Sequence, residues 1–272
     1  SRHRARPAGS ASLLAVLSRL RHLELTPRQY ARIADAGLIA LSVIVLSGAA
    51  VRLTGSGLGC PDWPKCHGGA LAPLETHSLI EYGNRVFSAL VGLIAAAAGV
   101  LAWRRRPFRR DLAIIGALLP LAVMAQGALG ALTVEHELAP AFVMAHFGLS
   151  MLTLIAAVAL AWRAHHEPGE RPRSSDRTEV WATRALLPLG GLVVLLGMVT
   201  TGAGPHAGSS GTGELVHRLD FKGSGTLGWM IHWHGRSATL LGLTSLFVWS
   251  LLRRRDAPRD RLLPLTVLCL LM

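Results

Sequence analysis

Six polar residues lie within or at the edge of long apolar stretches, where a charged group is costly and is a functional candidate by default. They are Glu81, Asn84, Arg85, His146, His232 and His234. Histidines that face one another in a helical bundle are a usual means of holding a haem, because neutral imidazole ligates iron. A carboxylate near such a group can stabilise charge or accept a proton. The histidines are therefore candidate haem ligands, and Glu81 is a candidate functional acid.

Each of these residues also has a simpler interpretation. His146 could be a buried histidine bonded to a neighbouring helix. Glu81 and Arg85 are spaced i,i+4 and could form an ion pair on one helix face. His232 and His234 are about 200° apart around a helix, so only one of them can face a bundle core. The other is then an interfacial residue.

Two of the three cysteines, Cys60 and Cys66, enclose a short segment that contains two prolines. They could form a disulfide if their Cα atoms come within about 7 Å. The alternative is a zinc site with His67, which lacks the usual ligand spacing. The residues favour the disulfide. Cys269 stands in an apolar stretch and is expected to pack there.

The composition is that of an integral membrane protein. The chain has 272 residues, of which 51% are hydrophobic and only 16% charged, against roughly 25% charged in an average globular protein. A helix needs about 20 apolar residues to cross a bilayer. The sequence predicts six spans, built on the uncharged runs Ala36–Val51, Val86–Trp103, Leu112–Val134, Leu138–Trp162, Ala185–Ala203 and Ser237–Leu252.

The helix starts are expected to extend into weakly polar flanks. The first helix can start near Arg32, the second near His77 and the sixth near Gly228. A seventh begins at Leu262 and reaches only Met272, too short a stretch to span, so we expect a seventh helix that is cut short.

The basic residues set the expected orientation. Of 28 Lys and Arg, 22 lie before the first helix or in the loops that follow the second, fourth and sixth helices. Such clusters mark cytoplasmic loops rather than nucleic-acid binding. The N-terminus is therefore predicted to be cytoplasmic, and the loops 54–77, 134–138 and 204–228 are predicted to face outward.

The chain also carries a weak internal repeat. Long glycine-rich loops follow the first and fifth helices, and Ile80–Arg85 and Ile231–Arg236 open the helices that come next. This pattern predicts an all-α protein of eight helices in two pseudo-repeated four-helix bundles, with the eighth helix absent from this chain. The expected divisions are a cytoplasmic basic tail (1–32), a first half (33–163), a cytoplasmic linker (164–184) and a second half (185–272).

Several segments together resemble the haem A synthase family. Gly48–Cys66 looks like the first outer loop of that family and Ile80–Arg85 like its second helix. Gln126–Thr133 and His146–Ser150 match its third and fourth helices, and Thr201–Gly208 is similar to the second-half loop of actinobacterial-type members. The resemblance covers about residues 36–252 in order.

The resemblance implies an enzyme that oxidises the C8 methyl of haem O to a formyl group, giving haem A for cytochrome oxidase. One half of the fold would take this substrate and the other a haem b cofactor. Glu81 matches the catalytic carboxylate, His146 an axial iron ligand of the first half, and Cys60 and Cys66 the outer-loop cysteine pair. The haem b ligand falls on His234 or His232.

The sequence departs from the family at one ligand. Many members have His-Arg where this chain has Asn84-Arg85. Either His146 alone holds the substrate haem, or an outer histidine such as His77 substitutes.

The implied surroundings are a bacterial plasma membrane, haem O delivered by a haem O synthase, cytochrome oxidase assembly, contact with lipid and a possible homo-oligomer. Two other functions compete. A non-catalytic di-haem b-type electron-transfer cytochrome would need the histidines but not Glu81. A transporter would use the repeat and the intramembrane acid, but its helices would be broken at the membrane midplane.

Overall fold

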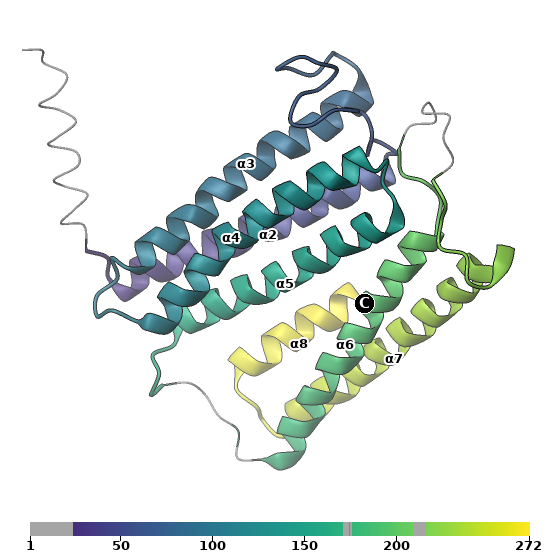
Figure 1. Ribbon diagram of the computed structural model, residues 1–272. Coiled ribbons are helices and arrows are strands. Elements are labelled where there is room, and N and C mark those ends of the chain that lie inside the picture. The colour runs from purple at the N-terminus through teal and green to yellow at the C-terminus, as the bar shows by residue number, and fades with distance from the viewer. Residues whose placement is uncertain (1–23, 171–173, 175, 209–215) are drawn as a thin grey trace, which may run out of the picture. The chain divides into compact units, whose positions relative to one another are not determined.

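The computed structural model describes residues 24–170, 174, 176–208 and 216–272 (Figure 1). Its regular structure in these ranges is helical, apart from two isolated bridges, Leu25–Arg105 and Cys66–Gly69. The helices are α2 (Pro27–Leu53), α3 (Thr76–Ala102), α4 (Arg110–Glu135), α5 (Pro140–His165), α6 (Arg177–Ala203), the 3-10 turn η1 (Gly223–Gly225), α7 (Thr226–Arg254) and α8 (Arg259–Leu271). The first 23 residues of the expected basic tail lie outside the described residues.

Six of these helices, α2 to α7, are long and apolar enough to cross a membrane, which confirms the six expected spans. The helix α8 has 13 residues and corresponds to the expected short seventh helix. The all-α class is thus confirmed for the described residues. The eight-helix architecture, its pseudo-repeat and the division into halves stay predictions.

Local sequence explains where the helices begin. At the start of α2, the Gln29 backbone N–H donates to Thr26 Oγ1 and the Thr26 N–H donates to Gln29 Oε1, a reciprocal capping box. Pro27 and Pro140 occupy first helical positions, where the missing N–H costs no hydrogen bond. The helix α6 begins at Arg177, inside the expected linker 164–184, because the Asp176 carboxylate accepts from the first N–H groups of that helix.

Three prolines lie inside helices: Pro120 in α4, Pro188 in α6 and Pro264 in α8. A proline removes one helical hydrogen bond and often kinks a helix. All three helices are nevertheless continuous through these positions. The broken helices that a transporter would require are therefore not found in the described part of the chain.

The chain divides into two compact units. Of the described residues, the first unit contains 24–44, 88–124 and 153–167. Its core includes Tyr30, which is fully buried and donates from its hydroxyl to the Ala98 carbonyl at 3.2 Å. The helices α3 and α4 approach closely at Gly99, where an added Cβ would lie 2.8 Å from the Gly116 carbonyl oxygen. Small residues permit this contact, as is usual between membrane helices.

Two buried arginines tie the connections of this unit. Arg105 is fully buried, pairs with Glu167 and donates to the Pro107 carbonyl. Arg109 pairs with Asp111 at 2.7 Å and donates to the carbonyl oxygens of Arg163 and His166. These guanidinium groups are buried with carboxylates and carbonyls around them, as buried charge requires.

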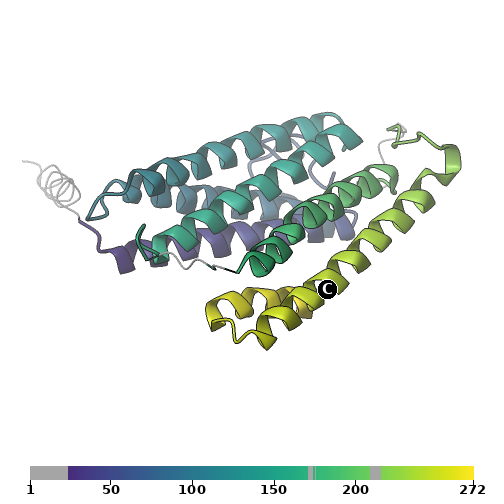
Figure 2. The same ribbon diagram turned by 90° about the horizontal axis from the view of Figure 1, so that it is seen from below.

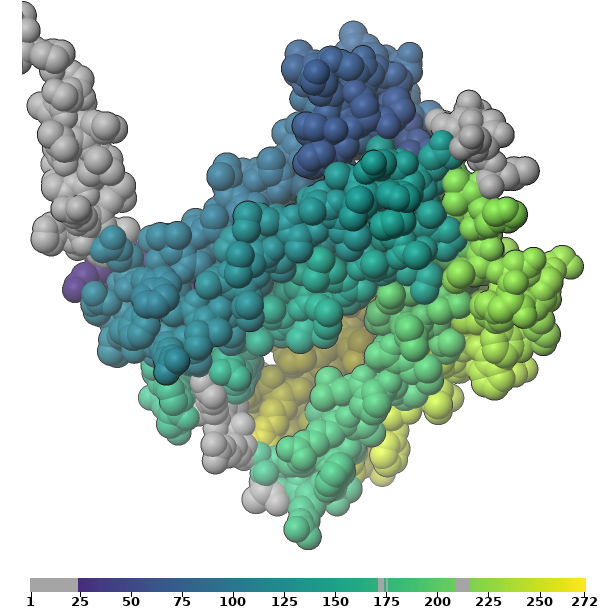
Figure 3. Space-filling view, viewed as in Figure 1, coloured from purple at the N-terminus to yellow at the C-terminus, as the bar shows by residue number. Residues whose placement is uncertain are grey.

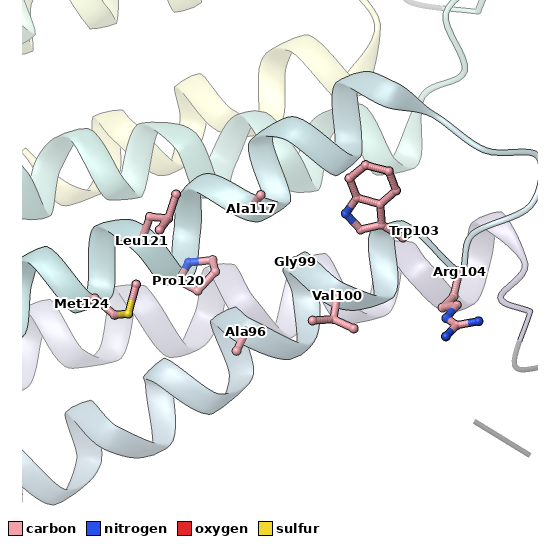
Figure 4. Close-up of a pocket in the computed structure, with 9 residues that line it drawn as sticks. All are labelled: Ala96, Gly99, Val100, Trp103, Arg104, Ala117, Pro120, Leu121 and Met124. Atoms are coloured by element: carbon pink, nitrogen blue, oxygen red, sulfur yellow. The ribbon is translucent and has the colours of Figure 1, made fainter. Parts of the chain in front are cut away.

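A groove of about 670 Å³ runs along α3 and α4 in the same unit (Figure 4). Its lining extends from Ala96 on α3 to Arg104, just after the end of that helix, and from Ala117 to Met124 on α4. The wall is apolar apart from Arg104 at one end. It contains none of the candidate site residues.

The second unit contains 45–87, 125–152 and the described residues of 168–272, and with them every candidate site residue. Figures 1 and 2 both show α6 and α7 side by side, with α8 packed beside α7. Val248, Leu252, Ala257 and Leu265 form a buried apolar cluster between α7 and α8. A glycine brings α5 and α6 together, since an added Cβ at Gly202 would lie 2.9 Å from the Met144 sulfur.

Candidate functional site

The loop of residues 54–75, which we call the disulfide loop, precedes α3 (Figure 1). It is closed by the predicted bond between Cys60 and Cys66. Figure 3 shows it as a compact block of side chains. Both cysteines are buried, with Cα atoms 4.6 Å apart. His67 Nε2 meets the Gly59 carbonyl at 2.9 Å. No group of three or more metal-ligating side chains occurs in the described ranges, so the zinc alternative has no support there.

Glu81 and Arg85 form the ion pair that their i,i+4 spacing allows, at 2.6 Å, in the first turns of α3. The pair also holds the disulfide loop. The second Glu81 oxygen accepts the Cys60 backbone N–H at 2.8 Å. Arg85 donates to the carbonyl oxygens of Cys60, Asp62 and Lys65 at 2.7–2.9 Å. The Glu81 side chain is only 7% exposed, so this carboxylate lies inside a satisfied network rather than on a solvated helix face.

Asp62 folds the tip of the disulfide loop. Its carboxylate oxygens accept the backbone N–H groups of His67 at 2.6 Å and Gly68 at 2.8 Å. The hydrogen bond from Gly68 holds the pKa of this carboxyl below its usual range, with further contributions from His67 and from the charge of Arg85. His67 and Gly68 both have positive φ, of 53° and 74°. The ionised Asp62 therefore stabilises a backbone turn that His67 adopts only at some cost.

His77, the candidate substitute ligand, lies at the start of α3 with an exposed side chain. Its Nδ1 lies 2.9 Å from the hydroxyl of the buried Ser56. Asn84 is partly buried about two turns further along α3.

His146 lies on α5 against α4. Its Nδ1 is buried and makes no hydrogen bond within the described part of the chain. The ring packs on Gly130, where an added Cβ would lie 3.5 Å from His146 Cε1. One turn away on α4, the Gln126 amide nitrogen donates to the His146 carbonyl at 3.1 Å and to Ser150 Oγ at 2.8 Å. Gln126 thus fixes the segment of α5 that carries this imidazole.

His234 lies on α7 against α6 in a similar setting. Its Nδ1 is 3.1 Å from the Val193 carbonyl oxygen, and its ring would come within 3.0 Å of a Cβ at Gly197. A carbonyl only accepts, so Nδ1 is the donor, and Nε2 is the ring nitrogen left to ligate a metal. His232 is exposed. Of the two histidines, His234 is therefore the one held against a neighbouring helix.

Three connecting segments are tied together near the end of α6. The Gly57 N–H donates to the Ala207 carbonyl at 3.0 Å, and His206 Nε2 donates to the Glu137 carbonyl at 2.6 Å. Arg52 and Arg218 both donate to the Thr201 carbonyl, at 3.3 and 2.9 Å. The sequence analysis assigned no role to these two arginines.

Six apolar helices, a disulfide-closed loop and histidines held between helices define a multi-pass helical membrane protein. The family described as cytochrome oxidase assembly protein (COX15-CtaA) matches residues 31–79 and 74–272. The chain belongs to this family, the haem A synthase family.

Relatives with known names agree with this membership. A heme A synthase of Alkalihalophilus pseudofirmus is 33% identical over 136 residues, which are 48% of this chain and 45% of the relative. One of Shewanella oneidensis is 31% identical over 185 residues, 61% of this chain and 53% of the relative. A protoheme IX farnesyltransferase of Halobacterium salinarum is 30% identical over 151 residues, 54% of this chain and 32% of the relative. The chain thus spans about half or less of the length of these relatives.

Proposed function

We propose that this chain carries haem A synthase activity, the oxidation of the C8 methyl of haem O to a formyl group. The observation that carries the proposal is the paired setting of His146 and His234. Each imidazole lies against a glycine of the preceding helix, in a chain that belongs to the haem A synthase family.

The two imidazoles fit iron ligation. His146 has a buried Nδ1 without a hydrogen bond to any described residue. His234 donates through Nδ1 and presents Nε2, as ligating histidines usually do when a second-shell acceptor fixes their tautomer. In the proposal, His234 holds haem b in the second half and His146 holds the substrate haem in the first. Haem b when bound would supply a redox-active iron that exchanges single electrons.

Glu81 is the proposed catalytic carboxylate. Converting a methyl group to a formyl group takes one oxygen atom from water and removes four electrons and four protons overall, and positive charge develops beside the porphyrin as the electrons leave. A nearly buried carboxylate stabilises such charge strongly, because the surrounding dielectric is low. Arg85 and the Cys60 N–H orient both oxygens of Glu81, so the disulfide loop fixes the position of the acid.

Asn84 stands where many haem A synthases have a histidine, so the first half lacks that candidate iron ligand. In the proposal His146 is the sole protein ligand of the substrate iron, since His77 is exposed and bonded to Ser56. A single ligand leaves one coordination position open, which suits oxidative chemistry.

The proposed surroundings follow from the family. The membrane is the bacterial plasma membrane, with the N-terminus cytoplasmic, and the product serves cytochrome oxidase assembly. One relative is named protoheme IX farnesyltransferase, which is consistent with haem O arriving from a haem O synthase. A homo-oligomer is part of the proposal that only a mass measurement in detergent will test.

The test is to express the protein with a haem O source, purify it, extract the bound haems and identify them by mass. Haem A beside haem b supports the synthase. Haem b alone would instead identify the di-haem electron-transfer cytochrome, and absence of any haem would refute both functions.

A further inference from the structure

Two half-buried arginines converge on one backbone oxygen in the second unit. Arg52 Nη2 lies 3.3 Å and Arg218 Nη2 lies 2.9 Å from the Thr201 carbonyl oxygen. Arg218 also donates to the carbonyl oxygens of Gly204 at 2.8 Å and Leu138 at 3.3 Å. Neither guanidinium forms an ion pair with an Asp or Glu of the described residues.

The two positive charges have no compensating anion among the described residues. Burial lowers the pKa of Arg218, and the charge of Arg52 lowers it further. Partly burying two like charges together is unfavourable unless an anion compensates them. Arg52 makes one hydrogen bond to the described residues, through Nη2, so its Nε and Nη1 groups are available to a ligand.

The arginines and His234 contact the same face of α6. Val193, Gly197 and Thr201 are spaced four residues apart and so share one face of that helix. The Val193 carbonyl accepts from His234 and Gly197 lies under its ring, whereas the Thr201 carbonyl binds the arginines. The Val193 and Thr201 carbonyl groups are eight residues apart, which is about two helical turns or about 12 Å along the axis, so the guanidinium groups lie beyond the histidine ring towards the C-terminal end of α6.

We infer that Arg52 and Arg218 form a binding site for the carboxylates of a porphyrin, the propionates of the haem whose iron His234 ligates. This inference rests on the proposed function. The propionates project from one edge of the macrocycle, away from the iron, so a site further along α6 than the iron ligand suits them. Guanidinium forks bind carboxylates through paired, charge-assisted hydrogen bonds.

The test compares two porphyrins that differ only in these carboxylates. Full-length protein is prepared free of haem, and iron protoporphyrin IX or its dimethyl ester is titrated in by absorbance. Wild-type protein is expected to bind the diacid tighter than the ester. Arg52→Gln and Arg218→Gln should each weaken diacid binding by about 10- to 100-fold, the loss typical of a hydrogen bond to a charged group. Ester binding should stay unchanged, which also shows that the variants are folded.

Lys222→Gln is the matched control, because it removes an exposed cation whose ammonium lies over the Trp229 ring. It should bind both porphyrins as the wild type does. Equal affinity of the wild type for diacid and ester would overturn the inference, as would variants that weaken both porphyrins equally, since the arginines would then only tie the loops. Two other results would count against the proposed function instead. The wild type would bind neither porphyrin, or His234→Ala would bind both as the wild type does.

Discussion

At the residue scale, the structure changes what a test of Glu81 must measure. An exposed i,i+4 ion pair is worth less than about 1 kcal/mol, but Glu81 and Arg85 are 7% and 14% exposed and also hold the disulfide loop. Removing one partner of a buried pair is far more damaging, at about 3–5 kcal/mol. The test therefore needs a side chain that has the shape and the accepting oxygen of Glu81 but not its charge. Loss of catalysis can then be measured separately from loss of the disulfide loop.

Glu81→Gln supplies this side chain. Its amide oxygen can still accept the Cys60 N–H, so we expect the disulfide loop to persist. Without the negative charge, haem A formation should fall by about 10²–10³-fold, while haem b content stays normal. The measurement is haem extraction together with a thiol count. Tyr82→Phe is the control, since it removes a hydrogen bond to Ala70 of the same loop but keeps the carboxylate. Haem A output within about threefold of wild type, less than 1 kcal/mol of barrier, would refute the catalytic role.

Asp62 should make the disulfide loop sensitive to acid. Because its pKa is lowered in the folded loop, the stabilisation is complete above the ordinary value of about 3.9 and is lost as the pH falls through the folded value. Reduction of the disulfide by a phosphine should therefore accelerate over that acidic window. Asp62→Asn should react faster already at pH 7 and lose this acid-dependent step. Identical profiles for both proteins would contradict the assignment.

At the scale of elements, glycines set how closely helices approach the candidate ligands. Gly197 lies under the His234 ring, with 3.0 Å to an added Cβ, whereas Gly191 on the same helix has open space. Gly197→Ala should displace the ring and lower haem b per protein, measured by pyridine haemochrome absorbance. Gly191→Ala should leave haem content unchanged and stabilise α6 by up to about 1 kcal/mol. Equal haem content in both variants would count against His234 as the ligand.

The elements also show which features a sequence can reveal. Apolar runs predicted six spans because hydropathy acts over whole helices. They placed the start of α6 too late, because Asp176 and the charged first turn extend that helix beyond its apolar run. The Glu81–Arg85 pair was visible as a local spacing. The roles of Arg52 and Arg218 were not, because their partners are backbone carbonyls, which every residue carries, and these lie far away along the chain.

At the scale of the whole molecule, the lopsided basic residues predict one orientation. A reporter fused after Arg106 should be cytoplasmic, and one inserted at Ala70 in the disulfide loop should be external. Paired fusions to an alkaline phosphatase and a fluorescent protein measure this, because each is active on one side only. The reverse pattern would refute the orientation and also remove the oxidising compartment that the disulfide requires.

The ties around the disulfide loop also impose an order in time on biogenesis. Cys60 and Cys66 are six residues apart, and Glu81 follows Cys60 by 21 residues. The disulfide and the hydrogen bond from Cys60 to Glu81 can therefore form once α2 and α3 have been inserted. The contact of Arg52 with Thr201 spans 149 residues. At about 5–20 residues per second, a ribosome needs roughly 7–30 s to supply that partner. The disulfide loop, held by Glu81, can thus fold and be accessible to oxidases and chaperones before His234 has been translated.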